Sequence, residues 1–420
     1  MVGSINLFSK PNPRAKHFAT TKDLLLKQYP VLILWIAIAV FITHGRLNAH
    51  AINNYLIFKN TFTHAINHIN LYGEYKNLYY DSNYYGPLFS LIMAPFSLLG
   101  NVLQLYAWQV FNVCLLFFAI QQLPLSTTHK NIICLICTQE LYTSLIEFQT
   151  NGAMAALIIL SWALIQKRND FWAAFCIVVG LYVKLYGIVG IAFFFFSGQK
   201  LKFMASMAFW AVVLFVLPMA FFSPQFILHS YADWYNALVS KNGMNQTSPY
   251  QDVSLAGMVR RIVNDKTLPS LPFIAGGMLL MALPYVRISR YKDQSFRLLS
   301  LSSILLFTVL FSSGSELVTY IIAFAGIGIW FMSLEKPAKR FELALLIFAI
   351  YFGSLFATDL FPKLWREQLI KPYALKALPC LVVWLMVIYQ MLFKRTVSMP
   401  SQKPVSISLP STELKDLVTA

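Results

Sequence analysis

Residues 201–222 read LKFMASMAFWAVVLFVLPMAFF and carry one charged side chain, Lys202. A helix that spans a bilayer needs about 20 apolar residues, so this stretch is long enough to cross a membrane. Similar apolar runs continue along the chain in both directions. They cover residues 31–43, 86–100, 102–122, 131–146, 151–166, 171–185, 187–197, 272–286, 297–312, 317–333, 341–356 and 378–393. The pattern predicts an all-α fold, a polytopic transmembrane bundle of roughly 11–13 membrane segments.

The composition excludes two other classes of protein. Of the 420 residues, 58% are hydrophobic and only 12% are charged, whereas a soluble globular chain carries about a quarter charged residues. The 17 acidic residues are too few to cover the surface of a soluble enzyme of this length. An aromatic content of 15% excludes an intrinsically disordered chain.

The net charge of +16 indicates how the chain is oriented in the membrane. Most Lys and Arg residues fall in the two tails and in short loops between apolar runs, which the positive-inside rule assigns to the cytoplasm. Nucleic-acid binding would require one continuous basic stripe, so no nucleic-acid partner is expected. We predict a cytoplasmic N-terminal tail over 1–30, a transmembrane domain over 31–394 and a disordered cytoplasmic tail over 395–420, in a multi-pass protein of the cytoplasmic membrane.

One stretch leaves two paths open. Gln149 lies outside if Lys167 lies inside, which requires either 131–146 or 86–100 to enter and leave the membrane on the same side. The run 86–100 contains Pro95, and a bent or re-entrant path is therefore plausible there. Periodicity does not choose between the two.

Three outer segments are too long to be turns: 45–85, 223–271 and 357–377. Long loops with their own pattern are usually functional. Apolar residues recur at near-helical spacing in the first of them, which predicts an amphipathic helix lying on the outer membrane surface. These apolar residues are Ile52, Leu56, Phe58, Phe62, Ala65, Ile66 and Ile69.

The same loop continues with many tyrosines. Tyrosine is enriched at membrane interfaces, so these residues are read first as anchors. Stacking of sugar rings on them is the alternative. The tyrosines are Tyr72, Tyr75, Tyr79, Tyr80, Tyr84 and Tyr85.

Cysteine and histidine spacings predict neither a cofactor nor a metal site. Cys134 and Cys137 have C-x-x-C spacing, but no second pair accompanies them, and buried structural thiols are favoured. His64 and His68 are four residues apart and would share a helix face, as metal ligands can. No H-E-x-x-H pattern surrounds them, and we expect solvated loop residues.

The charged residues of the outer loops suit one chemistry. Lys184 lies at the end of an apolar run, where it needs a partner, an anionic ligand or access to the interface. A lipid-linked phosphate is held at a membrane boundary by Lys or Arg, and a nearby carboxylate can deprotonate an acceptor hydroxyl. Phosphate leaves readily once cations neutralise it. Together these features indicate glycosyl transfer from a polyprenyl-phosphate sugar.

Short motifs, spread over residues 31–394, carry a family resemblance. They are Asn53-Asn54-Tyr-Leu-Ile-Phe-Lys59, Leu71-Tyr72, Tyr85-Gly-Pro87, Gln149-Thr-Asn151 and Lys184-Leu-Tyr. With them the chain resembles the membrane glycosyltransferases of family 87, which have the GT-C fold. Relatives transfer mannose from polyprenol-phosphate-mannose outside the cytoplasmic membrane. Three further segments resemble a bacterial subgroup: Gln251-Asp-Val-Ser254, Ser313-Gly-Ser-Glu316 with Thr319-Tyr320, and Lys376-Ala-Leu-Pro379.

The catalytic carboxylate departs from the family pattern. The family has an Asp in the first outer loop, and the matching position here is Asn54, which cannot act as a base. Either Asp81 or Glu74 supplies the carboxylate from later in the same loop, or the activity differs or is lost. We favour Asp81 because it precedes the Tyr85-Gly-Pro87 entry into the membrane.

The resemblance also implies binding residues. Lys184 would lie near the donor phosphate, with Lys59 close by, and Gln149 and Asn151 would line the cleft. Glu316 and Asp252 are candidates too, although both positions also suit helix caps. The remaining candidates for substrate binding are Asn54, Tyr320 and Lys376. The implied partners are a polyprenyl-phosphate-linked sugar, a lipid or glycan acceptor, and membrane lipid.

Two rival functions remain. A transporter would place polar residues at mid-membrane, usually within internal repeats. No repeat is visible, and Glu140 is the main mid-span acid. Another polyprenyl-linked glycan ligase or polymerase would share the outer cationic site.

Overall fold

The computed structural model describes residues 29–394 apart from 49, 101, 249–250 and 336. Almost all of the two predicted tails, 1–30 and 395–420, lies outside the described residues. The described part is built from helices joined by turns and contains no β-strand.

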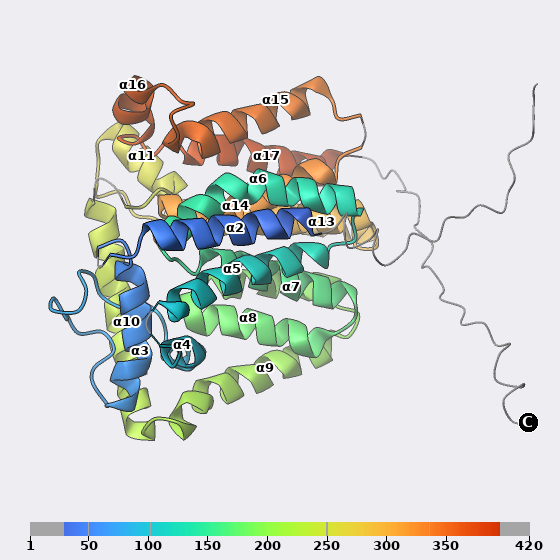
Figure 1. Cartoon of the computed structure of the whole chain (residues 1–420). Coiled ribbons are helices and arrows are strands. Elements are labelled where there is room, and N and C mark those ends of the chain that lie inside the picture. The colour runs from blue at the N-terminus through green and yellow to red at the C-terminus, as the bar shows by residue number, and fades with distance from the viewer. Residues whose placement is uncertain (1–28, 49, 101, 249–250, 336, 395–420) are drawn as a thin grey trace, which may run out of the picture.

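One set of helices forms a bundle whose members run side by side (Figure 1). Their spacing of apolar residues and their small number of charged side chains explain why they pack on one another. The bundle consists of α2 (Pro30–Gly45), α5 (Leu103–Gln121), α6 (Thr127–Ile146), α7 (Asn151–Gln166), α8 (Asp170–Lys184), η1 (Tyr186–Phe196), α9 (Lys200–Val216) with η2 (Leu217–Ala220), α12 (Leu271–Ala282) with η3 (Leu283–Val286), α13 (Gln294–Leu310), η5 (Leu317–Tyr320) with α14 (Ile321–Met332), α15 (Arg340–Phe348) with η6 (Ala349–Ser354) and η7 (Leu355–Ala357), and α17 (Ala377–Phe393).

A second set of helices covers one end of this bundle, at the left of Figure 1, where α3 and α10 run across the bundle direction. This set consists of α3 (Asn53–Ile66), α4 (Leu88–Ser97), α10 (Pro224–Thr247), α11 (Leu255–Val263) and α16 (Lys363–Trp365) with η8 (Arg366–Ile370). A short 3₁₀ turn, η4 (Ile288–Arg290), lies between η3 and α13. We call the covered end the α3/α10 end.

Length and composition agree with a membrane bundle. Among the described residues, three helical stretches are long and apolar enough to cross a membrane: Leu103–Gln121, Lys200–Ala220 and Arg340–Ala357. Eight shorter apolar helices accompany them, including α2, α7, α13 and α17. The expectation of an all-α, polytopic membrane bundle is confirmed.

The three long loops meet at the α3/α10 end. Asn70 Nδ2 donates to Asp233 Oδ2 at 3.0 Å, which joins loop 45–85 to loop 223–271. Arg261 Nη1 donates to Lys371 O at 3.3 Å, which joins loop 223–271 to loop 357–377. Segments far apart in the sequence therefore form one surface.

Basic residues in short loops and at helix ends lie at the other end. Arg287 donates to Leu392 O at 2.6 Å, and the Arg297 guanidinium donates to Gln166 Oε1. The first bond joins the segment before α13 to the end of α17, and the second joins the first turn of α13 to the end of α7. Lys167 follows α7 directly. We call this the basic end.

Of the two paths left open for residues 86–146, the structure has the one in which 86–100 enters and leaves on the same side. α6 is 20 residues long, about 30 Å at 1.5 Å per residue, and it runs the length of the bundle. α4 has 10 residues with Pro95 inside it, too short to cross. Ser97 Oγ donates to Lys59 O of α3 at 3.5 Å, so α4 both begins and ends at the α3/α10 end.

A tight turn between α8 and η1 returns the chain along the bundle. Leu185 adopts a left-handed φ of 55° there. η1 lies against α8 so closely that a Cβ on Gly187 would collide with the backbone of Ile177 and Gly180. Only glycine permits this approach. The turn leaves Lys184 at the tip, at the α3/α10 end.

The expected interfacial helix in the first loop is present as α3, although its buried face differs in part from the expected one. Phe58 and Ala65 are buried as expected, together with Tyr55. Ile66 and Ile69, which the apolar pattern placed on the same face, are 53% and 42% exposed. α3 ends at Ile66, so Ile69 falls outside its periodicity.

Candidate active site

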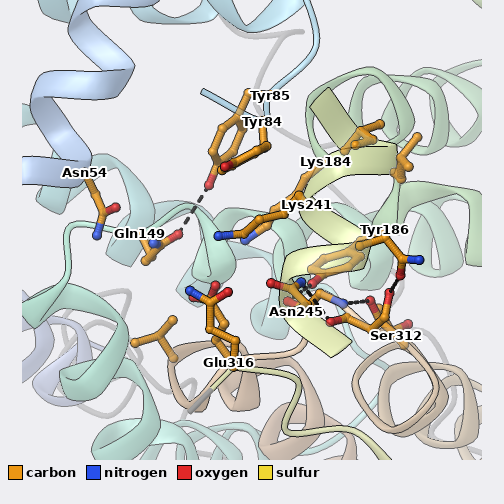
Figure 2. A pocket seen from close by; sticks show the side chains of 18 of the residues that line it. Asn54, Tyr84, Tyr85, Gln149, Lys184, Tyr186, Lys241, Asn245, Ser312 and Glu316 are labelled. Atoms are coloured by element: carbon orange, nitrogen blue, oxygen red, sulfur yellow. Dashed lines mark hydrogen bonds between the residues drawn. The ribbon is translucent and has the colours of Figure 1, made fainter. Parts of the chain in front are cut away.

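A cavity of about 730 Å³ opens at the α3/α10 end. Its walls come from α3, the loop before α4, the α8–η1 turn, α10 and the turn between α13 and η5. Figure 2 shows side chains from these separate segments converging on one space. We call it the main cavity.

Five of the residues singled out in the sequence line the main cavity. They are Asn54, Asp81, Gln149, Lys184 and Glu316. They come from four different parts of the chain, which the fold brings to one cavity.

Lys184 is held from several sides. Its Nζ donates to Asn151 Oδ1 at 2.9 Å and lies 5.7 Å from the ring centre of Tyr85 and 5.4 Å from that of Tyr186. Asn151 in turn donates to Val318 O at 3.1 Å. Asn151 thus lies behind Lys184, outside the lining of the cavity, and orients the ammonium group through a fixed carbonyl oxygen.

Lys241 supplies a second cation to the main cavity. Its Nζ lies 3.7 Å from Asp81 Oδ2 and 4.7 Å from the centre of the Tyr84 ring. Figure 2 shows Lys184, Lys241 and Glu316 directed toward one another. Sequence patterns did not single out Lys241 among the many cations of the outer loops. They predicted no helix over residues 224–247, where the structure has α10. The i, i+3 and i+4 positions Leu238, Lys241, Asn242 and Asn245, which all line the cavity, identify the site-facing side of α10.

Asp81 sits beside Tyr84 in the loop that leads to α4. The side chain of Asp81 is half exposed, accepts from Ser82 N at 2.8 Å and accepts from Tyr84 OH at 3.4 Å. Burial, together with the nearby Asp81 carboxylate, raises the pKa of Tyr84 to about 12. Tyr84 therefore keeps its proton at neutral pH and remains a donor to Asp81.

Two other carboxylates reach the main cavity. Glu147 lines it and pairs with Arg46 at 3.8 Å, while Asn54 Nδ2 donates to the Glu147 carbonyl at 2.8 Å. Glu316 is the N-cap residue of η5, which agrees with its interpretation as a helix cap. It also lines the cavity. Among the residues that the structure describes, no Lys or Arg forms an ion pair with Glu316.

Comparison with known families now adds a separate line of evidence. Residues 83–313 match the model of glycosyltransferase family 87. The match spans more than half of the chain. The protein belongs to glycosyltransferase family 87. No curated protein matches the sequence.

The chain is therefore a membrane glycosyltransferase and acts on a sugar donor and an acceptor. The matched region includes Gln149, Lys184 and Lys241. It begins two residues after Asp81 and ends shortly before Glu316.

Three of the candidate residues of this glycosyltransferase lie in buried contacts away from the main cavity. Asp252 forms an ion pair with Arg260 at 2.6 Å, with both side chains almost fully buried. Tyr320 OH donates to Val253 O at 2.6 Å. Lys376 Nζ lies 2.7 Å from Glu140 Oε2. The side chains that line the cavity do not include these three.

The Glu140–Lys376 pair also explains the acid noticed in mid-span. Both side chains are at most 2% exposed, and Lys376 donates in addition to Leu317 O at 3.1 Å. A buried charge is tolerated when it is paired. The pair joins α6 to the start of α17 and needs no transported substrate to account for it.

Lys59 and Glu74 also lie outside the main cavity. Lys59 belongs to α3, whose cavity-facing residues are Asn54, Ile57 and Phe58. Glu74 is exposed and pairs with Lys76 at 3.2 Å. It lines a second cavity of about 550 Å³ that shares Asp81 with the first.

The two neighbouring histidines have different surroundings. His64 is buried against the ring of Tyr75, with ring centres 4.3 Å apart. His68 Nε2 accepts from Ser223 N at 3.4 Å. Within the described part of the chain, no group of three or more His, Cys, Asp or Glu side chains is arranged to hold a metal ion.

Proposed function

We propose that this glycosyltransferase moves a hexose, mannose-like, from a polyprenyl-phosphate donor to a lipid or glycan acceptor on the outer face of the cytoplasmic membrane. The observation that carries the proposal is the main cavity itself. It combines two lysines and several carboxylates with an apolar wall made by membrane helices. A GT-C architecture is part of the proposal.

The apolar wall suits the lipid part of such a donor. It is formed by Ile188 and Val189 of η1, Ile274 of α12, Phe307 of α13, and Phe311 directly after α13. Ile188 is 50% exposed, so the wall continues to the outside of the bundle. An isoprenoid chain placed there would bury apolar surface while its phosphate reaches Lys184 and Lys241.

The polar part of the cavity suits the reaction. Lys184 and Lys241 neutralise the donor phosphate. The acceptor hydroxyl attacks the anomeric carbon and transfers its proton to the Asp81 carboxylate, which acts as general base. The bond between the anomeric carbon and the phosphate oxygen breaks, and the polyprenyl phosphate leaves with the electron pair.

The positions of the short basic loops support this orientation. The basic loops lie at the end opposite the main cavity, and basic loops face the cytoplasm. The cavity then faces the outer side. Family membership favours transfer over the transporter alternative, whereas a ligase or polymerase acting on another polyprenyl-linked glycan remains the second candidate because it would use the same cations.

The test uses the full chain in proteoliposomes with radiolabelled polyprenyl-phosphate mannose and a bacterial lipid and glycan extract that supplies the acceptor hydroxyl. We expect release of polyprenyl phosphate by the wild type, and a loss of about a hundredfold in Lys184→Ala and Lys241→Ala. Lys202→Ala, which removes an equal charge at the basic end, should retain the wild-type rate. Consumption of a nucleotide sugar without any use of the lipid-linked sugar would refute the proposal.

A further inference from the structure

The second cavity lies directly beside the main one. Its volume is about 550 Å³, enough for a sugar unit or two by comparison with ordinary ligand sites of about 300–1,000 Å³. Asp81, Ser82 and Tyr84 line both cavities. A group bound in the second cavity and a donor bound in the main cavity would therefore both reach the Asp81 side chain.

α10 divides its faces between the two cavities. Asp233, Asn236 and Ser240 line the second cavity, and their spacing of three and four residues puts them on one face of the helix. Lys241 and Asn245 line the main cavity. The helix α10 thus sets the distance between a ligand bound in the main cavity and a ligand bound in the second cavity.

Tyrosines form much of the other wall of the second cavity. Tyr79 is buried, and Tyr80 stacks on His50 with ring centres 5.0 Å apart and planes at 14°. Tyr75 packs against His64. Each of these rings contacts a histidine or another tyrosine and lines the cavity beside polar groups, whereas anchoring tyrosines would face lipid. Fixed aromatic faces beside amide and hydroxyl groups suit a sugar ring, which has apolar C–H faces and hydroxyl edges.

The charges separate this cavity from a phosphate site. Glu74, Asp81 and Asp233 line it, and Lys76 is its single Lys or Arg among the described lining residues. Lys76 is paired with Glu74. An anionic group would be repelled there, while uncharged hydroxyls find acceptors in Asp233 and Asn236.

We propose that the second cavity binds the terminal, uncharged sugar of the acceptor and presents its hydroxyl to Asp81. The inference rests on the proposed function, because it names the acceptor of the same reaction. The hydroxyl gives its proton to Asp81 and forms the new bond to the anomeric carbon of the donor in the main cavity. The acceptor is accordingly a glycan or glycolipid whose end carries no phosphate or carboxylate.

The experiment compares two adjacent residues of α10. Ser240→Trp fills the second cavity, whereas Val239→Trp adds the same ring at a position that is 56% exposed and lines neither cavity. Binding of a mixture of neutral disaccharides (mannobiose, cellobiose and maltose) is followed by saturation-transfer NMR on the purified full chain. Binding of radiolabelled polyprenyl-phosphate mannose is measured on the same samples.

We expect saccharide signals from the wild type and from Val239→Trp, weakened about tenfold in Ser240→Trp, with donor binding equal in all three proteins. Equal saccharide signals in Ser240→Trp, or none in the wild type, would overturn the acceptor site. Saccharide binding that Ser240→Trp removes, in a protein that does not bind the lipid donor, would instead contradict the proposed donor and leave the second cavity as a sugar site. Failure of the acceptor site and failure of the proposed donor therefore give different results.

Discussion

Lys241 Nζ lies 3.7 Å from Asp81 Oδ2 and so joins α10 to the loop before α4. The Asp81 side chain is 50% exposed, and an ion pair of this kind contributes only about 0–1 kcal/mol to stability. The ion pair matters for geometry, because it holds the Asp81 carboxylate between the second cavity and the lysines proposed to bind the donor phosphate.

Asp81→Asn should lower transfer by about 10²–10⁴-fold with little change in donor binding, because the amide keeps the shape but cannot accept a proton. Glu147→Gln and Glu316→Gln are matched controls on carboxylates of the same cavity. Rates are measured with radiolabelled lipid-linked sugar. Full activity in Asp81→Asn, with loss in either control, would assign the base to that residue.

Asn151→Leu should raise the KM for the donor about tenfold and leave kcat within about twofold. The substitution removes the oxygen that orients Lys184 while keeping the lysine itself. Lys184→Met should lower both binding and turnover. An unchanged KM in Asn151→Leu would show that the two tyrosine rings suffice to hold Lys184.

Acidification should loosen the wall of the second cavity. Burial lowers the pKa of His64 below its ordinary 6.5, so the unfolded chain takes up a proton before the folded protein does. The contribution of His64 to stability is then complete above pH 6.5 and is lost as the pH falls through the lowered value. Proteolysis of the loop after α3 should accelerate in that window, and His64→Phe should flatten the response. An identical pH dependence in both proteins would contradict this.

Gly187→Ala should destabilise the protein by about 1–3 kcal/mol, because the added methyl group meets the backbone of α8. Gly243→Ala is the control, since its added Cβ would meet nothing within 4 Å and alanine favours a helix by about 1 kcal/mol. Thermal unfolding in detergent measures both. Activity should fall with the first substitution because Lys184 depends on the turn.

Lys376→Met should cost about 3–5 kcal/mol, since it leaves Glu140 buried without its partner. The double variant Glu140→Leu with Lys376→Met should recover most of that loss. Thermal unfolding of the two single variants and the double variant gives the coupling energy. Recovery of transfer activity in the double variant would show that Lys376 does not bind substrate directly, and failure to recover it would argue for a role in the site.

Sequence patterns were sufficient for the class of fold and for part of the site. Apolar runs such as 201–222 predict membrane helices because the bilayer allows no unpaired backbone groups. The first loop also contained enough periodicity to predict α3. Residue type and motif single out Asp81, Gln149 and Lys184, and these three side chains line one cavity.

The burial of particular residues required the tertiary structure. Asp252, Tyr320 and Lys376 have the same chemistry as site residues, but each finds a partner inside the protein: Arg260, Val253 and Glu140 respectively. A single sequence shows which residues are charged or polar, and it does not show which of them neutralise one another.

By itself, the sequence determined that this protein lies in a membrane, that its polar loops concentrate at one end, and that lysine and carboxylate groups are available there. Only the tertiary structure decided that α4 stays at the α3/α10 end, that Lys241 completes the main cavity, and that Asp81 borders two cavities. The physical reason is the range of the interactions. Hydrophobicity and helical periodicity are properties of residues that are close in the sequence. The contact between Lys241 and Asp81 instead depends on how α10 packs across the ends of helices that are far apart in the sequence.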